Sequence, residues 1–344
     1  MKQTSHIVVS CLCIAGLLQI YLQTSFTNWC MYENKSVPQA ELKREKDDIL
    51  MMVMGEKQMF PIWLNRLKAL KIGADLTFVY GSYDEEIIKN DTDVTDFSDS
   101  FTYSTIFIPK TTWTQGRTLL GEKAIELEYN RAKKFDFWGF SDDDFDLVCN
   151  FPTVFDTSED CWEQVFYNLR TDLPSKITMI APQLSPKQNL EFGRAVTSVD
   201  AIFNVFRREY VPYYQPYVAL PPGESEWLSQ LVLFLVVQTC FPSSVYVIPR
   251  MFGKNPLHRK YARGLPLDVM KTIAQKNYGN VTDAAISRFE SGKSFYDHMH
   301  GSTPHARDIE EVNDSIPSHN LMQCRPMKER YEKWEQEVIN RINN

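Results

Sequence analysis

Apolar and polar residues alternate in blocks, and the first blocks after residue 47 predict a strand, a helix and a second strand. Residues 48–55 (DILMMVMG) form an apolar run that ends in glycine. Residues 60–70 carry apolar side chains at helical spacing, with Pro61 in the first turn, and residues 74–80 are typical of a strand. Because the three elements follow one another so closely, they predict a βαβ unit with a parallel sheet.

The same alternation continues through the centre of the chain. The polar residues 84–100 predict a loop, and residues 105–109 (TIFIP) predict a short strand. Residues 113–117 (WTQGR) predict a Gly-Arg turn, and residues 118–134 predict a helix with one apolar face. This helix leads directly into an aromatic strand that begins at Phe135.

Later elements are fewer and more widely spaced. Residues 177–181 and 245–249 predict two further strands, and residues 228–240 predict an apolar helix that is too short and too polar for a membrane span. Residues 266–344 predict helices separated by polar loops, the last a charged helix at 327–342. The pattern therefore predicts an α/β fold, with a Rossmann-type mixed sheet flanked by helices and a helical C-terminal region.

The N-terminal segment indicates export from the cytoplasm. Residues 3–32 contain no Asp, Glu, Lys or Arg, and residues 7–22 are almost continuously apolar. No small-x-small cleavage site follows, so the pattern favours an uncleaved signal anchor over a cleaved signal peptide. The predicted organisation is a cytoplasmic tail, the anchor, a stem, a catalytic domain and a helical region, at residues 1–6, 7–29, 30–46, 47–265 and 266–344.

Sequons and cysteines agree with a secretory location. Glycosylation sequons occur at Asn34, Asn90, Asn280 and Asn313, each in a polar stretch. Five cysteines lie outside the anchor, and the simplest disulfide to expect joins Cys149 to Cys161, 12 residues apart. The absence of a CxxC motif or a Cys/His ladder in the sequence argues against a zinc module.

Composition narrows the class of partner. The chain has 344 residues and a formal net charge of −7. A protein that binds duplex DNA normally presents a basic face to the phosphates, so a nucleic acid is not the expected partner.

Three consecutive carboxylates end the aromatic strand, at Asp142, Asp143 and Asp144. A buried strand that stops in this way brings acidic side chains to the sheet edge at which open α/β folds bind ligands. Adjacent carboxylates repel one another, so we expect a divalent cation there, bridging to substrate phosphates. The alternative is a solvated acidic turn that only closes the strand.

Two other acidic motifs use the same residues. An EF-hand loop that starts at Asp142 needs a glycine where Leu147 stands and a glutamate where Thr153 stands, so this motif is excluded. A phosphatase motif with Asp144 as nucleophile and Asp146 as its partner lacks the expected glycine turn and the apolar residues before it. It is kept as a minor alternative.

Arg117 and a cluster of aromatic residues are further candidates. Near a helix N-terminus, Arg117 can place its guanidinium and backbone N–H groups beside a phosphate, or it can simply cap a surface turn. The aromatic residues in 210–217 can stack on sugar rings, or they can pack in the core.

Residues 113–147 resemble the nucleotide-sugar half of GT-A-fold glycosyltransferases, whose signature is an apolar strand running into an Asp-x-Asp motif. The predicted tail, anchor, stem and luminal domain are similar to type II Golgi members of that class. The resemblance implies that Asp142 and Asp144 are the Asp-x-Asp pair and hold Mn²⁺ (or Mg²⁺) chelated by the sugar diphosphate. It also implies that Asp142 contacts the nucleotide sugar, with Asp143 sharing in this.

The resemblance implies a general base in the acceptor half. In inverting members a carboxylate before a helix removes the acceptor hydroxyl proton. Glu226 and Glu224 open the predicted helix at 228–240 and are the candidates, with Asp200 in reserve. The helix dipole alone favours carboxylates at that place, so helix capping is the default role.

The resemblance also implies that a C-terminal histidine adds a metal ligand. His298 and His300 would lie on one face of a strand and are the candidates, beside His258 and His305. The basic run at 250–263 is either a solvated face or a loop that closes over the diphosphate.

The sequence thus predicts a metal-dependent glycosyltransferase that moves a sugar from a nucleotide-diphosphate donor to a hydroxyl of a glycan, protein or lipid acceptor. Its expected location is the Golgi membrane with the catalytic domain in the lumen, and a secreted or ER-luminal protein is the alternative. The second hypothesis for function is a membrane-anchored binding or scaffold ectodomain that has the fold without the reaction.

Overall fold

The computed structural model describes most of the predicted catalytic domain and the last helix. The described residues are 47–85, 95–98, 101–109, 112–149, 158–170, 177–183, 194–196, 202–217, 240–241, 244–254, 272, 275–276, 307–308, 322 and 324–344. They belong to one compact unit, Lys46–Asn344. Within these residues no helix is long and apolar enough to cross a membrane, and the predicted anchor and stem lie outside them.

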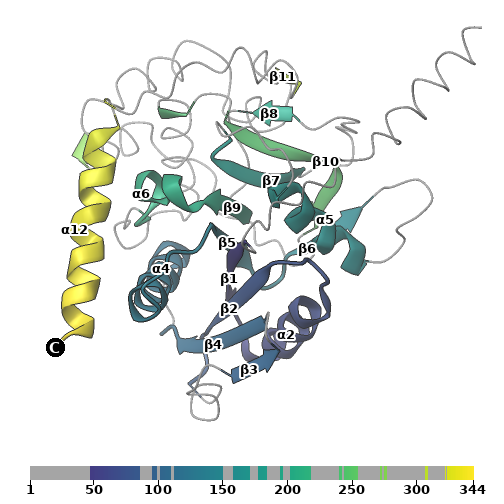
Figure 1. Ribbon diagram of the computed structural model, residues 1–344, viewed down its shortest axis with the longest axis horizontal. Helices are drawn as coiled ribbons and strands as arrows, with labels where there is room; N and C mark the ends of the chain where they lie inside the picture. The colour runs from purple at the N-terminus through teal and green to yellow at the C-terminus, as the bar shows by residue number, and fades with distance from the viewer. Residues whose placement is uncertain are drawn as a thin grey trace, which may run out of the picture. The chain divides into compact units, whose positions relative to one another are not determined.

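A mixed sheet forms the centre of this unit (Figure 1). The described strands follow the order β11-β8-β10-β7-β9-β5-β1-β2-β4-β3, and β6 pairs with β10 beside this path. Four neighbouring strands are parallel: β4 (Phe101–Phe107), β2 (Asp75–Ser82), β1 (Asp48–Gly55) and β5 (Phe137–Asp142). These four strands confirm the predicted parallel arrangement.

Shorter strands flank the parallel group. At one edge β3 (Thr95–Ser98) runs antiparallel to β4, and on the other side β9 (Phe203–Arg207) runs antiparallel to β5. Beyond β9, strand β7 (Met179–Gln183) pairs in parallel with β10 (Val245–Lys254). The antiparallel partners of β10 and β8 complete the sheet: β6 (Asp146–Cys149), β8 (Arg194–Val196) and β11 (Arg307–Asp308).

Burial on both faces explains the apolar character of β1. Residues 49–53 are completely buried, as expected of a central parallel strand covered by helices on both sides. Leu50 and Met52 pack towards α4 (Trp113–Asn130) and α12 (Arg325–Ile342). The intervening side chains pack on the opposite face, towards α2 (Phe60–Ala69) and α5 (Ser158–Arg170). Figure 1 shows α4 and α2 on either side of the parallel strands.

The beginning of α4 corrects one expectation from the sequence. The segment predicted as a Gly-Arg turn is the start of the helix, because Thr112 and Gln115 form a capping box. The Thr112 hydroxyl accepts the Gln115 backbone N–H at 3.3 Å, and the Gln115 side chain accepts the Thr112 backbone N–H at 3.2 Å. Gly116 lies inside the helix, where the absence of a side chain leaves room for Met54: a Cβ there would lie 2.6 Å from Met54 Sδ.

Other predicted elements differ mainly at their ends. The strand predicted at 105–109 begins earlier, at Phe101, and the segment predicted as a loop contains the edge strand β3. The strands predicted at 177–181 and 245–249 correspond to β7 and β10, and the predicted charged helix is α12. The apolar helix predicted at 228–240 lies almost wholly outside the described residues.

Short helical segments follow β1 and β9. The 3-10 helix η1 (Lys57–Met59) leads into α2, and η3 (Arg208–Tyr210) leads into α6 (Val211–Tyr214). Of the aromatic residues in 210–217, Tyr213, Tyr214 and Tyr217 are buried, and Tyr210 is partly buried. For these three tyrosines the structure supports core packing.

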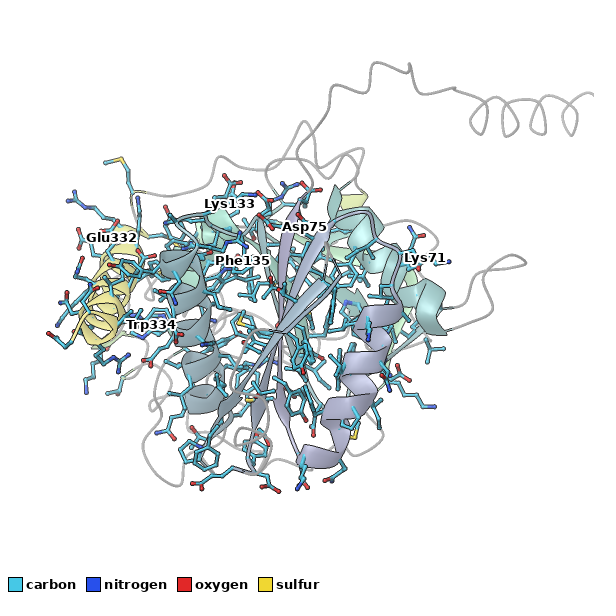
Figure 2. The ribbon with its side chains drawn as sticks, turned by 60° about the horizontal axis from the view of Figure 1, so that its bottom comes forward. Lys71, Asp75, Lys133, Phe135, Glu332 and Trp334 are labelled. Atoms are coloured by element: carbon cyan, nitrogen blue, oxygen red, sulfur yellow. A yellow bond between two sulfur atoms is a disulfide. The ribbon has the colours of Figure 1, made fainter. Side chains whose placement is uncertain are left out.

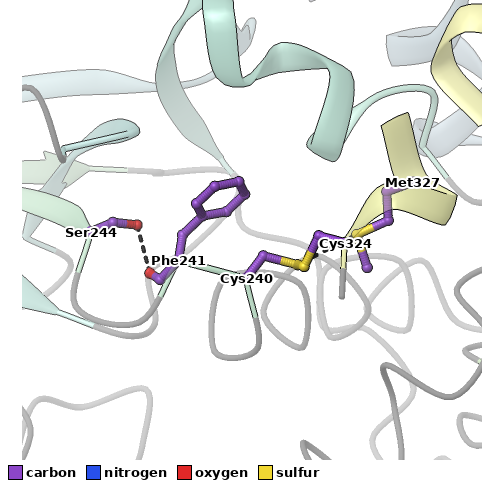
Figure 3. The surroundings of a disulfide bond; sticks show 5 residues. All are labelled: Cys240, Phe241, Ser244, Cys324 and Met327. Carbon is purple, nitrogen blue, oxygen red and sulfur yellow. Dashed lines mark hydrogen bonds between the residues drawn. A yellow bond between two sulfur atoms is a disulfide. The ribbon is translucent and has the colours of Figure 1, made fainter. Parts of the chain in front are cut away.

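Two disulfides are present in the described part of the chain. Cys149 is joined to Cys161, as predicted, and links β6 to α5. Cys240 is joined to Cys324, which is the N-cap residue of α12. Figure 3 shows this second disulfide between Phe241 and Met327. Cys30 lies outside the described residues.

A buried ionic network fastens α12 to the sheet. Arg208 donates to both carboxylate oxygens of Glu128 at 2.7 and 2.8 Å, and to the hydroxyl of Tyr331 on α12 at 2.9 Å. Burial alone lowers the pKa of Arg208, but the hydrogen bond and charge of Glu128 outweigh it and raise that pKa. Trp138 Nε1 donates to the same Glu128 carboxylate at 3.0 Å. Trp334, labelled in Figure 2, adds a hydrogen bond from α12 to Glu122 at 3.3 Å.

We expect Arg208→Met to destabilise the protein by about 3–5 kcal/mol, because it leaves the Glu128 carboxylate buried without a cation. Urea unfolding followed by circular dichroism measures the change. Lys333→Met is the matched control: Lys333 is exposed, and the expected change is within about 0.5 kcal/mol. A loss of less than about 1 kcal/mol for Arg208→Met would contradict the role of this ion pair.

Candidate functional site

The order of the parallel strands reverses between β1 and β5. From β1 the chain passes through α2 to β2 on one side, and from β4 it returns through α4 to β5 on the other side. At such a switch point the loops after neighbouring strands diverge and leave space at the carboxyl ends, where open α/β sheets bind ligands. Gly55 ends β1 there and Glu56 follows it, while Asp142 ends β5 and Asp143 and Asp144 follow directly. The acidic triplet therefore lies at the position expected for a ligand site.

Asp142 is neutralised by residues of α4. Its Oδ1 accepts hydrogen bonds from Trp113 Nε1 at 2.8 Å and from Arg117 Nη2 at 2.9 Å. The Arg117 guanidinium also lies 4.0 Å from the centre of the Trp113 ring. Burial lowers the pKa of Arg117, but the carboxylate of Asp142 and the hydroxyl of Tyr217 outweigh it, so the pKa is raised and the side chain stays charged.

The environment of Arg117 bears on its predicted role. Its side chain is 0 % exposed and also donates to the Ile202 carbonyl at 3.2 Å and to the Tyr217 hydroxyl at 3.4 Å. In this arrangement Arg117 holds Asp142 in place, and it reaches a phosphate only if neighbouring side chains move. Contact between Arg117 and a nucleotide sugar remains a prediction. The alternative role, capping of a surface turn, is wrong because the side chain is buried.

Asp143 packs directly on the end of β1. Its Oδ2 accepts the backbone N–H of Glu56 at 2.8 Å, and its backbone carbonyl accepts Trp63 Nε1 at 2.9 Å. A Cβ on Gly55 would lie 1.9 Å from Asp143 Cγ, so only glycine leaves room for this carboxylate. Burial, and then the charges of Asp144, Asp142 and Glu56, raise the pKa of Asp143 to about 6, against the opposing effect of the Glu56 N–H.

The turn after Asp143 is fixed from the α2 side. Arg66 Nη2 binds Asp146 Oδ1 at 3.0 Å, and its guanidinium lies 4.8 Å from the Trp63 ring centre and 5.4 Å from that of Trp162. Asp144 is partly exposed within this turn. The acidic turn is thus held from both faces of the sheet, by α4 at Asp142 and by α2 at Asp143 and Asp146.

The charges and donor atoms of this turn fit a cation that arrives with a phosphorylated ligand. Among the residues that the structure describes, no group of three or more His, Cys, Asp or Glu side chains is arranged to hold a metal ion. Burial is the largest cause of the raised pKa of Asp143, and the neighbouring carboxylates Asp144, Asp142 and Glu56 raise it further. Mg²⁺-type sites commonly use one or two carboxylates and take their remaining ligands from water and substrate phosphates. Asp142 and Asp144 are the carboxylates that would hold such an ion.

Several predicted site residues are not tested by this geometry. The candidate bases Glu224, Glu226 and Asp200 lie outside the described residues, as do the candidate metal ligands His298 and His300. Their roles remain predictions from the resemblance.

Sequence reasoning missed residues that are distant from the acidic turn in the sequence but contact it in the structure. Trp113 and Trp63 each donate an indole N–H to the acidic turn. In the sequence Gly55 indicates only the end of a strand, although a glycine between an apolar strand and a charged residue can signal a close approach. The side chains of the two tryptophans gave no such signal.

Comparisons with known proteins add little to this geometry. No protein-family model and no curated protein sequence matches the chain. Among solved structures, the chain is similar to a mannosyltransferase from Pyrobaculum calidifontis in complex with GDP-Man and Mn²⁺, at 9 % identity and a TM-score of 0.38, covering 86 % of this chain and 84 % of that one. A TM-score this low assigns neither a fold nor a function, so the functional interpretation depends on the residues of the acidic turn.

We expect Gly55→Ala to weaken Mn²⁺ binding, because the added methyl group displaces the Asp143 carboxylate from the Glu56 N–H. Titration calorimetry with MnCl₂ measures the affinity, and thermal unfolding measures the accompanying loss of about 1–3 kcal/mol. Gly139→Ala is the control, since its Cβ would lie 2.6 Å from Met51 Sδ and touch no carboxylate. Equal Mn²⁺ affinities in the two variants would contradict this role of Gly55.

We expect Asp143→Asn to raise the melting temperature at pH 7.5 in EDTA. The folded state binds the Asp143 proton more tightly than the unfolded chain, with a pKa of about 6 against 3.8. The resulting stability is fully present below pH 3.8 and is lost as the pH rises through about 6. The asparagine variant avoids that loss.

Melting curves from pH 4 to 8 measure the difference between Asp143→Asn and the wild type. The gain should be about 2 °C or more at pH 7.5 and should shrink towards pH 4. A difference that does not change with pH would show that ionisation of Asp143 is not its cause.

Proposed function

We propose that this protein is a metal-dependent glycosyltransferase that moves a sugar from a nucleotide-diphosphate donor to a hydroxyl acceptor. One observation carries the proposal: the acidic triplet Asp142–Asp144 ends β5 at the switch point of a parallel sheet. The partly compensated charge there suits a diphosphate bound together with a cation. A divalent ion, when bound, offsets the negative charge that develops on the leaving diphosphate.

Each residue of the turn has a distinct part in this proposal. Asp142 and Asp144 hold the cation, and Arg117 with Trp113 keeps Asp142 in one orientation through the two hydrogen bonds to Oδ1. Asp143, held by the Glu56 N–H, fixes the turn over β1. A preorganised turn reduces the cost of ordering these side chains when the donor binds.

The acceptor side of the reaction rests on the sequence. In an inverting reaction the acceptor oxygen bonds to the anomeric carbon, the bond from that carbon to the diphosphate oxygen breaks, and a carboxylate takes the acceptor proton. Glu226 is proposed as that base, with Glu224 and Asp200 as the alternatives. The acceptor is a glycan, a protein or a lipid.

We also propose a luminal location in the secretory pathway, with residues 7–29 as the anchor in the Golgi membrane. Two disulfides in the described chain support an oxidising compartment, since such bonds are rare where thiols are kept reduced.

We expect UDP or GDP with MnCl₂ to raise the melting temperature, whereas either nucleotide with EDTA should not. A ligand at 100 times its dissociation constant adds about 2.7 kcal/mol to the stability of the folded state. Asp144→Ala should abolish the Mn²⁺-dependent shift and the hydrolysis of nucleotide sugars. Glu332→Ala removes an exposed carboxylate of α12 and is the control that should retain both.

A result without any shift or hydrolysis, across UDP, GDP and their sugar derivatives, would contradict the glycosyltransferase proposal. A Mn²⁺-dependent shift without hydrolysis or transfer would indicate a nucleotide-binding ectodomain without the reaction.

A further inference from the structure

A pocket lies at the end of the parallel strands opposite to the acidic turn. Its volume is about 460 Å³, and its described lining includes the starts of β1, β2 and β4 and the last turn of α4. The acidic turn follows the carboxyl ends of these parallel strands, whereas this pocket lies at their amino ends. Figure 2 labels Asp75 and Phe135, two residues of its lining. The pocket is therefore separate from the site described above.

Hydroxyl groups form the floor of this pocket. On the sheet face that meets α4, Thr77 and Thr102 are partners across β2 and β4, and Ser104 follows two residues later on β4. The two threonine hydroxyls are 3.1 Å apart and share one hydrogen bond, so the accepting hydroxyl keeps a proton to donate. Farther along the same face the residues become apolar, with Val79 and Ile106 in the core around α4. The polar floor is thus confined to the pocket.

The Ser104 hydroxyl is the strongest indication of a ligand. Ser104 is 7 % exposed, and its Oγ has no hydrogen-bond partner in the described part of the structure. A buried hydroxyl without a partner is unfavourable, and because this oxygen is itself inaccessible to solvent, a ligand in the pocket satisfies it only when the neighbouring side chains move.

The charges around the pocket exclude a strongly anionic ligand. Arg131 lines the wall, but its guanidinium donates to Asp48 Oδ2 at 3.0 Å and to the carbonyls of Lys133 and Lys134. It also lies 3.8 Å from the centre of the Phe135 ring. Asp75 and Asn130 add a carboxylate and an amide to the lining. These groups offer hydrogen-bond acceptors to a ligand that carries many hydroxyl protons, and Leu127 offers an apolar surface.

We propose that this pocket binds a neutral, hydroxyl-rich ligand of the size of a mono- or disaccharide. Pockets for small ligands typically measure about 300–1,000 Å³ and combine a few polar groups with an apolar wall, as this one does. The proposal does not depend on glycosyl transfer, because it uses residues at the other end of the strands. It makes the protein a carbohydrate binder at two separate places if both proposals hold.

Saturation-transfer NMR tests the proposal, with methyl α-mannoside, galactose, N-acetylglucosamine and maltose as probes. One variant is Ser104→Ala. The other combines Thr77→Val with Thr102→Val, so that both hydroxyls of the pair are removed and neither is left without its partner. All measurements are made with UDP, GDP and MnCl₂ in excess, so that a nucleotide site at the acidic turn is occupied.

We expect at least one probe to bind to the wild type, about 3- to 10-fold more weakly to Ser104→Ala, and not at all to the triple variant that combines Ser104→Ala with Thr77→Val and Thr102→Val. Ser104→Ala should keep the wild-type melting temperature, because its hydroxyl makes no hydrogen bond without the ligand. Absence of binding by every probe, or unchanged binding in the triple variant, would overturn the proposal. A clear loss of stability in Ser104→Ala would do the same, since it would show that the hydroxyl serves the fold.

Discussion

The arrangement of the acidic turn depends on a buried guanidinium. Arg117 is inaccessible to solvent, and the charge of Asp142 is the reason it can be buried in that position. In return, Arg117 fixes the carboxylate at the end of β5, while Trp113 covers the guanidinium and binds the same oxygen. Without this pair, the last residue of β5 would be one of three adjacent carboxylates free to separate by mutual repulsion. This ion pair fixes the first residue of the turn.

The neighbouring strand supplies the second constraint. β1 and β5 are paired in parallel up to Met54 and Asp142, so the residues after each strand meet at the same edge. Gly55 is small enough to let Asp143 lie against it, and Glu56 offers its N–H to the carboxylate. The turn is therefore placed by backbone geometry as well as by charge, and α2 holds it from the other face through Trp63 and Arg66. The position of the turn therefore depends on the sheet and on both helical layers together.

Much of the fold followed from local patterns. The fully buried strands β1 and β5 were predictable because burial on both faces selects continuous apolar runs, and α2 and α12 because each shows helical spacing. The predicted start of α4 was wrong because Gly116 and Arg117 suggested a turn. The capping box formed by Thr112 and Gln115 starts the helix earlier.

The carboxylates of the site were predictable, but their partners were not. A strand ending in Asp142–Asp144 is visible in the sequence. The contacts that fix it join residues far apart: Arg117 precedes Asp142 by 25 positions, and Trp63 precedes Asp143 by 80. A local pattern carries no information on such pairs, since they form only when the sheet is assembled. The same holds for Arg208 with Glu128, which are 80 residues apart.

The late position of α12 in the sequence has a consequence for biosynthesis. Every described strand is synthesised before this helix. Arg208 nevertheless donates a hydrogen bond to Tyr331, and Cys240 forms its disulfide with a cysteine 84 residues downstream. During translation, therefore, the emerging sheet carries an incompletely paired arginine and an unmatched cysteine while five earlier cysteines are already present. We expect the nascent chain to need protection by chaperones and oxidoreductases until α12 leaves the ribosome.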